Sequence, residues 1–236
     1  MRSQRAFILG LFLLTSGCVV PQAEVSPEGT LEVFGASAIG PDARLRDDWV
    51  LDGGDGDAVA PDAVAVDIRD GKPVLTLRTT PERFVVARRT KATLLATPYL
   101  GWSWRVAAAT GHESDIRMIV AFHGGNPESR SWGSEPLAYL GLKLPPFDRA
   151  ITILWGRSAL ERGSFVARPA IAEYVARGGA EHEDAWWSDN LDLAELYRKA
   201  WPDDRIERAR IMFAGFAVAA GSGDARASFG DIVLYR

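Results

Sequence analysis

Residues 64–78 have the sequence VAVDIRDGKPVLTLR, and this stretch decides the expected fold. Two runs of β-type residues, 64–68 and 73–78, flank the four-residue turn RDGK at 69–72. An Asp-Gly pair favours a turn with positive φ, whose twist matches that of the strands it joins. The stretch therefore predicts a β-hairpin, and short strands separated by turn residues continue through the rest of the chain.

Further strands are predicted by alternation. In YLGWSWRV at 99–106, Trp102, Trp104 and Val106 share one face. In IRMIVAF at 116–122, Arg117 lies on the face opposite the large apolar side chains. The remaining expected strands are 84–88, 151–155, 165–167, 170–175, 211–219 and 227–235. Strands at this spacing, without alternating helices, favour an all-β, mainly antiparallel sandwich.

One segment departs from the β pattern. Residues 188–190 (SDN) offer helix N-caps, apolar residues then recur at helical spacing, and Pro202 ends the pattern. We expect a single amphipathic helix near 189–201, lying against a sheet.

The amino terminus has the pattern of a secretory signal. Arg2 and Arg5 precede an apolar stretch, 6–14, and small residues lead to Cys18. The pattern resembles the lipobox of bacterial lipoproteins, which implies cleavage before Cys18 and its acylation with chains such as palmitate. We therefore expect a signal peptide at 1–17, a flexible tether at 18–30 and one β-sandwich domain at 31–236. The alternative is an ordinary signal peptide in which the cysteine is incidental.

Several acyl chains would anchor the protein stably beside a membrane. Val19 is not the aspartate associated with inner-membrane retention, so the expected location is the outer membrane, facing the periplasm.

Cys18 is the only cysteine, which excludes an intramolecular disulfide. The net charge of −4 becomes −6 when the two signal-peptide arginines are removed, which argues against a nucleic-acid partner.

Several stretches resemble the DUF3047 family, bacterial proteins of unknown function. Tyr99–Val106 resembles its L-x-W-x-W-x-V strand and Phe229–Ile232 its terminal F-x-D-I strand. The weaker matches are 115–122, 151–155 and the helix region 184–201. The chain departs from the family's acidic positions at 111–115 and 219–224. The resemblance implies a jelly-roll-like sandwich, similar to galactose-binding and carbohydrate-binding modules, and no known activity.

The eight tryptophans indicate a large aromatic core, an aromatic-lined cleft, or both. Trp102 and Trp104 could form a platform for sugar rings; alternatively, as same-face residues of a central strand, they are core. Arg105 and Arg117 could hold a carboxylate or sugar hydroxyls through their planar forks. Alternatively, the two arginines lie on a solvated face and form structural ion pairs with Glu113 or Asp115.

Three further features are weaker candidates. His123 ends a strand before HGGN and could be a functional imidazole or a structural one. The polar residues 182–184 (HED), followed by Trp186 and Trp187, could form a metal or acid/base site, a binding lip or a solvated loop that leads into the helix. No zinc motif is present, and we expect no metal or other cofactor. An irregular calcium loop at 52–57 (DGGDGD) is the alternative left open, because it lacks EF-hand spacing.

These observations favour a non-catalytic envelope lipoprotein that binds a ligand, most plausibly a glycan. One alternative is a glycan-active hydrolase with two facing carboxylates, whose positions sequence spacing does not give. Another is a structural or assembly lipoprotein that binds a second envelope protein through an exposed apolar patch. No catalytic residue is identified by any motif.

Overall fold

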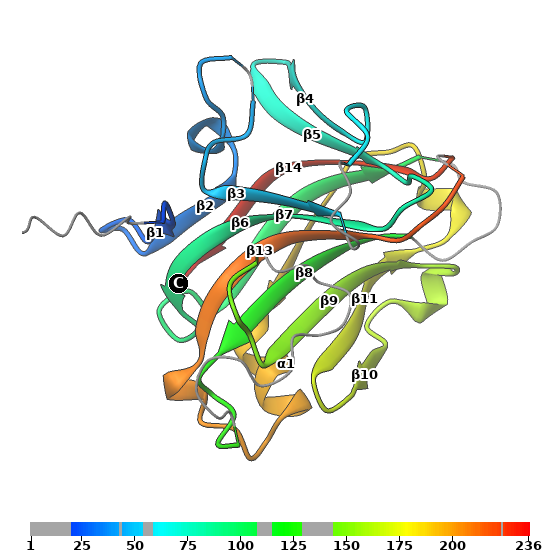
Figure 1. The fold of residues 1–236 in the computed structure, drawn as a ribbon. Coiled ribbons are helices and arrows are strands. Elements are labelled where there is room, and N and C mark those ends of the chain that lie inside the picture. The colour runs from blue at the N-terminus through cyan, green and yellow to red at the C-terminus, as the bar shows by residue number, and fades with distance from the viewer. Residues whose placement is uncertain (1–19, 43, 54–58, 108–114, 129–143, 223) are drawn as a thin grey trace, which may run out of the picture.

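The protein is a sandwich of two β-sheets (Figure 1). The computed structural model describes residues 20–42, 44–53, 59–107, 115–128, 144–222 and 224–236. Nearly all strand pairs are antiparallel, and β1–β6 and β9–β11 are the parallel pairs within this part of the chain. The predicted all-β, mainly antiparallel sandwich is confirmed.

The larger sheet has eight strands among the described residues, in the order β1-β6-β13-β8-β9-β11-β10, with β3 also paired to β6. Its strands are β1 (Ala23–Glu24), β3 (Trp49–Gly53), β6 (Phe84–Thr93), β8 (Ile116–His123), β9 (Arg149–Gly156), β10 (Phe165–Ala167), β11 (Ile171–Gly178) and β13 (Arg210–Val218).

The smaller sheet has six strands in the same part of the chain, in the order β12-β7-β14-β5-β4, with β2 also paired to β14. Its strands are β2 (Thr30–Phe34), β4 (Val64–Arg69), β5 (Lys72–Arg78), β7 (Tyr99–Val106), β12 (Trp187–Asp192) and β14 (Arg226–Tyr235). Short 3₁₀ turns occur at Ala36–Ala38, Ala159–Glu161, Ala180–His182 and Ile206–Arg208.

The main core lies between the two sheets and is rich in aromatic rings. Trp104 packs edge-on against Trp102 and Trp155, with ring centroids 5.8 and 5.1 Å apart. Phe216 of the larger sheet meets Phe229 of the smaller one at 4.2 Å. These contacts account for much of the tryptophan content, because alternation directs one face of each strand toward the opposite sheet.

The hairpin predicted at 64–78 is present as β4 and β5. Its two turn residues, Asp70 and Gly71, have φ values of 51° and 76°. Positive φ at both central positions is the geometry that an Asp-Gly sequence favours.

The helix is shorter than the sequence indicated. It is α1 (Leu193–Ala200), and residues 188–190 belong to β12 rather than to its cap. Residues 187–192 pair with β7, so their backbone groups are already bonded in a sheet. Asp192 is the true N-cap, and its side chain accepts a hydrogen bond from the Glu195 backbone N–H at 2.8 Å.

The expected signal peptide and Cys18 lie outside the described residues. Part of the expected tether is attached to the domain, because Ala23 and Glu24 pair in parallel with Thr90 and Lys91 of β6. Within the described part of the chain, no helix has the length and apolar character needed to cross a membrane.

Candidate functional site

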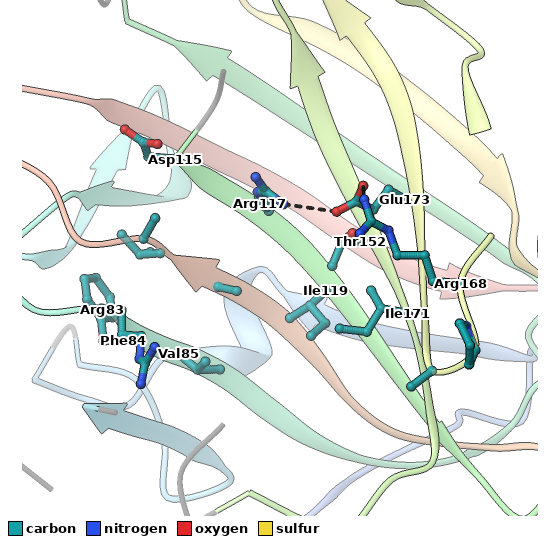
Figure 2. Close-up of a pocket in the computed structure, with 15 residues that line it drawn as sticks. Arg83, Phe84, Val85, Asp115, Arg117, Ile119, Thr152, Arg168, Ile171 and Glu173 are labelled. Atoms are coloured by element: carbon teal, nitrogen blue, oxygen red, sulfur yellow. Dashed lines mark hydrogen bonds and ion pairs between the residues drawn. The ribbon is translucent and has the colours of Figure 1, made fainter. Parts of the chain in front are cut away.

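A pocket of about 590 Å³ lies on the face of the larger sheet that points away from the smaller sheet. Figure 2 shows its lining residues, which come from β6, β13, β8, β9 and β11 and from the turn before β11. The lining residues are Arg83, Phe84, Val85, Asp115, Arg117, Ile119, Thr152, Arg168, Pro169, Ala170, Ile171, Glu173, Ala217, Val218 and Ala219.

The register of the strands explains the depression in the outer surface of the larger sheet. Ala217 of β13 lies between Val85 of β6 and Arg117 of β8. In the next row on this face, Gly215 of β13 is opposite Ile119 of β8. The small side chains of a central strand thus lie beside larger ones, which leaves a depression along β13.

The floor of the pocket is apolar and includes the lining residues Val85, Ile119 and Ile171. Val85 and Ile119 also belong to an apolar cluster on this same face, separate from the main core, whose other members are Ala87, Ala121, Phe147, Ala150 and Phe213. Phe147 and Phe213 meet edge-on at 5.2 Å. The larger sheet therefore has buried apolar side chains on both of its faces.

The polar wall of the pocket is an Arg–Glu–Arg arrangement. Arg117 Nη1 lies 3.3 Å from Glu173 Oε1, and Arg168 Nη2 lies 3.3 Å from Glu173 Oε2. Thr152 is opposite Glu173 in the parallel β9–β11 pair, which fixes the glutamate on the pocket face. Figure 2 shows Arg117 between Glu173 and Asp115, which lies at the other end of the pocket.

The structure separates the two predicted arginines. Arg105 is on β7 of the smaller sheet, and its Nη2 lies 3.2 Å from Asp184 Oδ1. It lines a polar depression of about 530 Å³ on that sheet's outer face. The prediction that Arg105 and Arg117 form one binding pair is therefore wrong, because β7 and β8 belong to different sheets. The partner of Arg117 is Arg168, bridged by Glu173.

The sugar-platform interpretation of Trp102 and Trp104 is also wrong. Their exposed fractions are 2% and 1%, so their rings cannot stack on a ligand. Their shared face is turned toward the opposite sheet, as the core alternative predicted. The indole N–H of Trp104 donates to Asp189 at 2.9 Å.

His123 lies at the end of β8 and outside the pocket lining. Its Nδ1 is 3.4 Å from Asp148 Oδ2, and the Asp148 side chain is nearly fully buried. Asp148 also accepts a hydrogen bond from the Gly124 backbone N–H at 3.1 Å. Asp148 thus holds Gly124, the first residue after β8, and His123 does not join Arg117 in one pocket.

The two neighbouring tryptophans, Trp186 and Trp187, differ in environment. Trp186 is 43% exposed. The Trp187 ring lies 4.1 Å from the Arg177 guanidinium, and its N–H donates to the His182 carbonyl at 2.8 Å. Burial, with the nearby charges of Asp184 and Glu181, raises the pKa of Glu183. Neither tryptophan lines the pocket.

The described residues contain no group of three or more His, Cys, Asp or Glu side chains arranged to hold a metal ion. The calcium loop considered at residues 52–57 lies mostly outside the described residues, because 54–57 are not described. Asp52 and Gly53 belong to β3.

Sequence reasoning missed Arg168 and Glu173 as site residues. Glu173 lies within the expected strand 170–175, where alternation places it on the same face as Ile171. This alternation could have identified Glu173 as a polar residue on an otherwise apolar face of the strand. The parallel pairing with β9, which brings it near Arg117, has no local sequence signal.

Comparison with family models matches residues 59–233 to DUF3047, described as a protein of unknown function. The chain therefore belongs to the DUF3047 family. The comparison with curated proteins found no match.

Among solved structures, the chain is similar to a family 30 carbohydrate-binding module, with 13% identity and a TM-score of 0.45, covering 88% of each chain. It is also similar to the family 11 carbohydrate-binding module from Clostridium thermocellum (10% identity, TM-score 0.38, 80% and 88% covered). A third is the xyloglucanase domain of NopAA from Sinorhizobium fredii in complex with cellobiose (10% identity, TM-score 0.41, 90% and 99% covered).

Proposed function

We propose that this protein is a glycan-binding β-sandwich without catalytic activity, and that the ligand occupies the pocket on the outer face of the larger sheet. The observation that carries the proposal is the combination, in one pocket, of an apolar floor and the Arg117–Glu173–Arg168 wall. A sugar ring has an apolar C–H face and a rim of hydroxyl groups. Guanidinium donors and a carboxylate acceptor match that rim.

The pocket's size supports the same proposal. Its volume of about 590 Å³ falls within the range of about 300–1,000 Å³ typical of small-ligand sites. Two of its wall residues, Arg117 of β8 and Glu173 of β11, are held by the sheet ladder, and Arg168 lies on the turn before β11. A rigid site of this kind reduces the entropy lost when a ligand binds.

The arrangement of carboxylates supports binding rather than hydrolysis. A glycosidase needs two carboxyl groups that face each other across the scissile bond, about 5–10 Å apart. Among the described residues, the acidic ones in the pocket lining are Asp115 and Glu173, and Figure 2 shows Arg117 between them. Both oxygens of Glu173 are already paired with arginine.

The lipoprotein-type signal adds a cellular location to the proposal. We propose that acylation of Cys18 holds the sandwich at the periplasmic side of the outer membrane, where envelope glycans are available. The sequence pattern around Cys18 is the support for this part.

The test is a glycan-array screen with the purified full chain, followed by calorimetry on each hit. Ala217→Phe should fill the depression along β13 and lower affinity at least about tenfold, since a filled pocket excludes the ring. Ala65→Phe is the matched control, because Ala65 lies on the outer face of the smaller sheet. It should leave affinity unchanged.

Absence of binding to every glycan, or unchanged affinity in Ala217→Phe, would overturn the proposal. The same glycans, incubated with the protein and assayed for new reducing ends, test the non-catalytic part. Release of reducing ends that Ala217→Phe abolishes would establish a hydrolase instead.

A further inference from the structure

We infer that the pocket binds a sugar unit that carries a carboxylate, a uronate, and that Arg117 and Arg168 receive that carboxylate. This inference rests on the proposed function and specifies its ligand class. It follows from the charge of the lining, the geometry of its ion pairs and the donors that those pairs leave available.

The polar wall of the pocket is cationic in an acidic protein. Two arginines, Arg117 and Arg168, share one glutamate, Glu173. These three side chains together carry one excess positive charge, whereas the whole chain has a net charge of −4. A site lined in this way attracts anions against the field of the remaining molecule.

The ion pairs in the pocket differ from the structural ones in the same protein. Arg88–Asp48 and Arg177–Asp189 are each 2.8 Å long, and all four of these side chains are less than 10% exposed. Both contacts of Glu173 are 3.3 Å long, and the side chains of its arginine partners are 34% and 62% exposed. Charge-assisted hydrogen bonds of full strength are about 2.7–2.9 Å long. The pocket arginines are therefore paired less closely with their carboxylate than the two buried arginines are with theirs.

Each pocket arginine retains donors after pairing with Glu173. Its contact with the glutamate uses one terminal nitrogen of each guanidinium, Nη1 of Arg117 and Nη2 of Arg168. A guanidinium has five N–H donors in a planar fork. Glu173 thus holds two forks side by side while most of their donors stay available. A planar carboxylate fits such donors bidentately.

The apolar floor positions the remainder of the sugar. Ile119 and Ile171 line the pocket together with the arginines. A uronate has its carboxylate on the ring carbon skeleton, so the anion and the apolar ring face can be bound together. The single excess charge of the Arg117–Glu173–Arg168 wall matches one carboxylate better than a dianionic phosphate.

The test is calorimetric titration of the full chain with paired ligands of equal length, trigalacturonate and galactotriose. We expect trigalacturonate to bind at least about tenfold more tightly, as one charge-assisted contact provides. The preference should shrink in 0.5 M NaCl, because these arginines are partly exposed and salt screens them.

Arg117→Gln and Arg168→Gln should each weaken trigalacturonate binding about tenfold, while galactotriose binding changes less than about twofold. Arg105→Gln is the matched control. Arg105 is 38% exposed and pairs with a carboxylate at 3.2 Å, much like Arg117, but on the other sheet. It should change neither affinity. Thermal unfolding of each variant verifies that the fold is retained.

Equal affinity for the two trisaccharides would overturn the inference and leave the proposed function standing. Binding of neither trisaccharide, nor of any glycan on the array, would overturn both. Tighter binding of inorganic phosphate or of a sulfated trisaccharide than of trigalacturonate would overturn the carboxylate assignment.

Discussion

Asp189→Ala should destabilise the protein more than any surface substitution, because Asp189 joins the two sheets. Asp189 is on β12 of the smaller sheet, and Arg177 is on β11 of the larger one. Arg177 donates to both carboxylate oxygens of Asp189, at 2.8 and 3.0 Å. Trp104 and Arg162 also donate to Asp189, at 2.9 and 3.2 Å.

The expected loss of stability follows from the Arg177 charge, which the substitution leaves without its partner. Arg177 is 7% exposed, so removal of its partner leaves a buried charge without compensation. Such a loss costs about 3–5 kcal/mol. We expect a decrease of about 4 kcal/mol in the free energy of unfolding. For a domain of this size, that decrease lowers the melting temperature by about 8–16 °C.

The assay is urea unfolding followed by tryptophan fluorescence and circular dichroism, with thermal melts in parallel. Asp67→Ala is the control, because its ion pair with Arg69 is 3.8 Å long and largely exposed. The control should lose less than about 1 kcal/mol. Asp189→Asn keeps the shape and removes the charge, so a loss close to that of alanine would attribute the effect to the charge. The reasoning fails if Asp189→Ala loses no more than the control.

Other expected outcomes concern the core, three glycines and the lipid anchor. Burial raises the pKa of Tyr197 above its usual 10.0, so its contribution to stability is complete below about pH 10 and is lost as pH rises further. Tyr197→Phe should reduce the fall in stability between about pH 10 and 11 in urea titrations. Gly215→Ala should cost about 1–3 kcal/mol, because a Cβ there would lie 2.3 Å from the Val86 backbone oxygen. Gly230→Ala should be tolerated, since its nearest contact is 3.6 Å. Gly71→Ala should cost about 1–2 kcal/mol in the same measurement, from its positive φ alone. Cys18→Ser should abolish metabolic labelling with an alkyne-palmitate and release the protein from membranes.

Features that depend on neighbouring residues were predictable from the sequence. The hairpin at 64–78 follows from an Asp-Gly turn between two β-type runs, and the strand at 99–106 follows from its alternation. The helix start was predicted incorrectly for the same local reason. Residues 188–190 are good caps by type, but pairing with β7 places them in a strand, and sheet pairing is not a local property.

The candidate site depends on register between strands that are distant in the sequence. Arg117 and Glu173 are brought together because β8 and β9 are antiparallel neighbours and β9 and β11 are parallel neighbours. Alternation correctly placed Arg117 on the face opposite the core, but it contains no information about which strand lies alongside. For that reason Arg105, which has the same kind of pattern, was paired with Arg117 incorrectly.

The tryptophans on the facing strands serve the core rather than a binding site. The high tryptophan content indicated an aromatic core, an aromatic-lined cleft, or both, and burial of Trp102, Trp104 and Trp155 between the sheets makes these rings part of the core. Among the described residues of the outer pocket, the aromatic lining residue is Phe84, which is itself 2% exposed. This described lining therefore gains little from stacking and depends on directional donors and charge. This is why the anionic group of a ligand, more than its ring, should determine what the pocket selects.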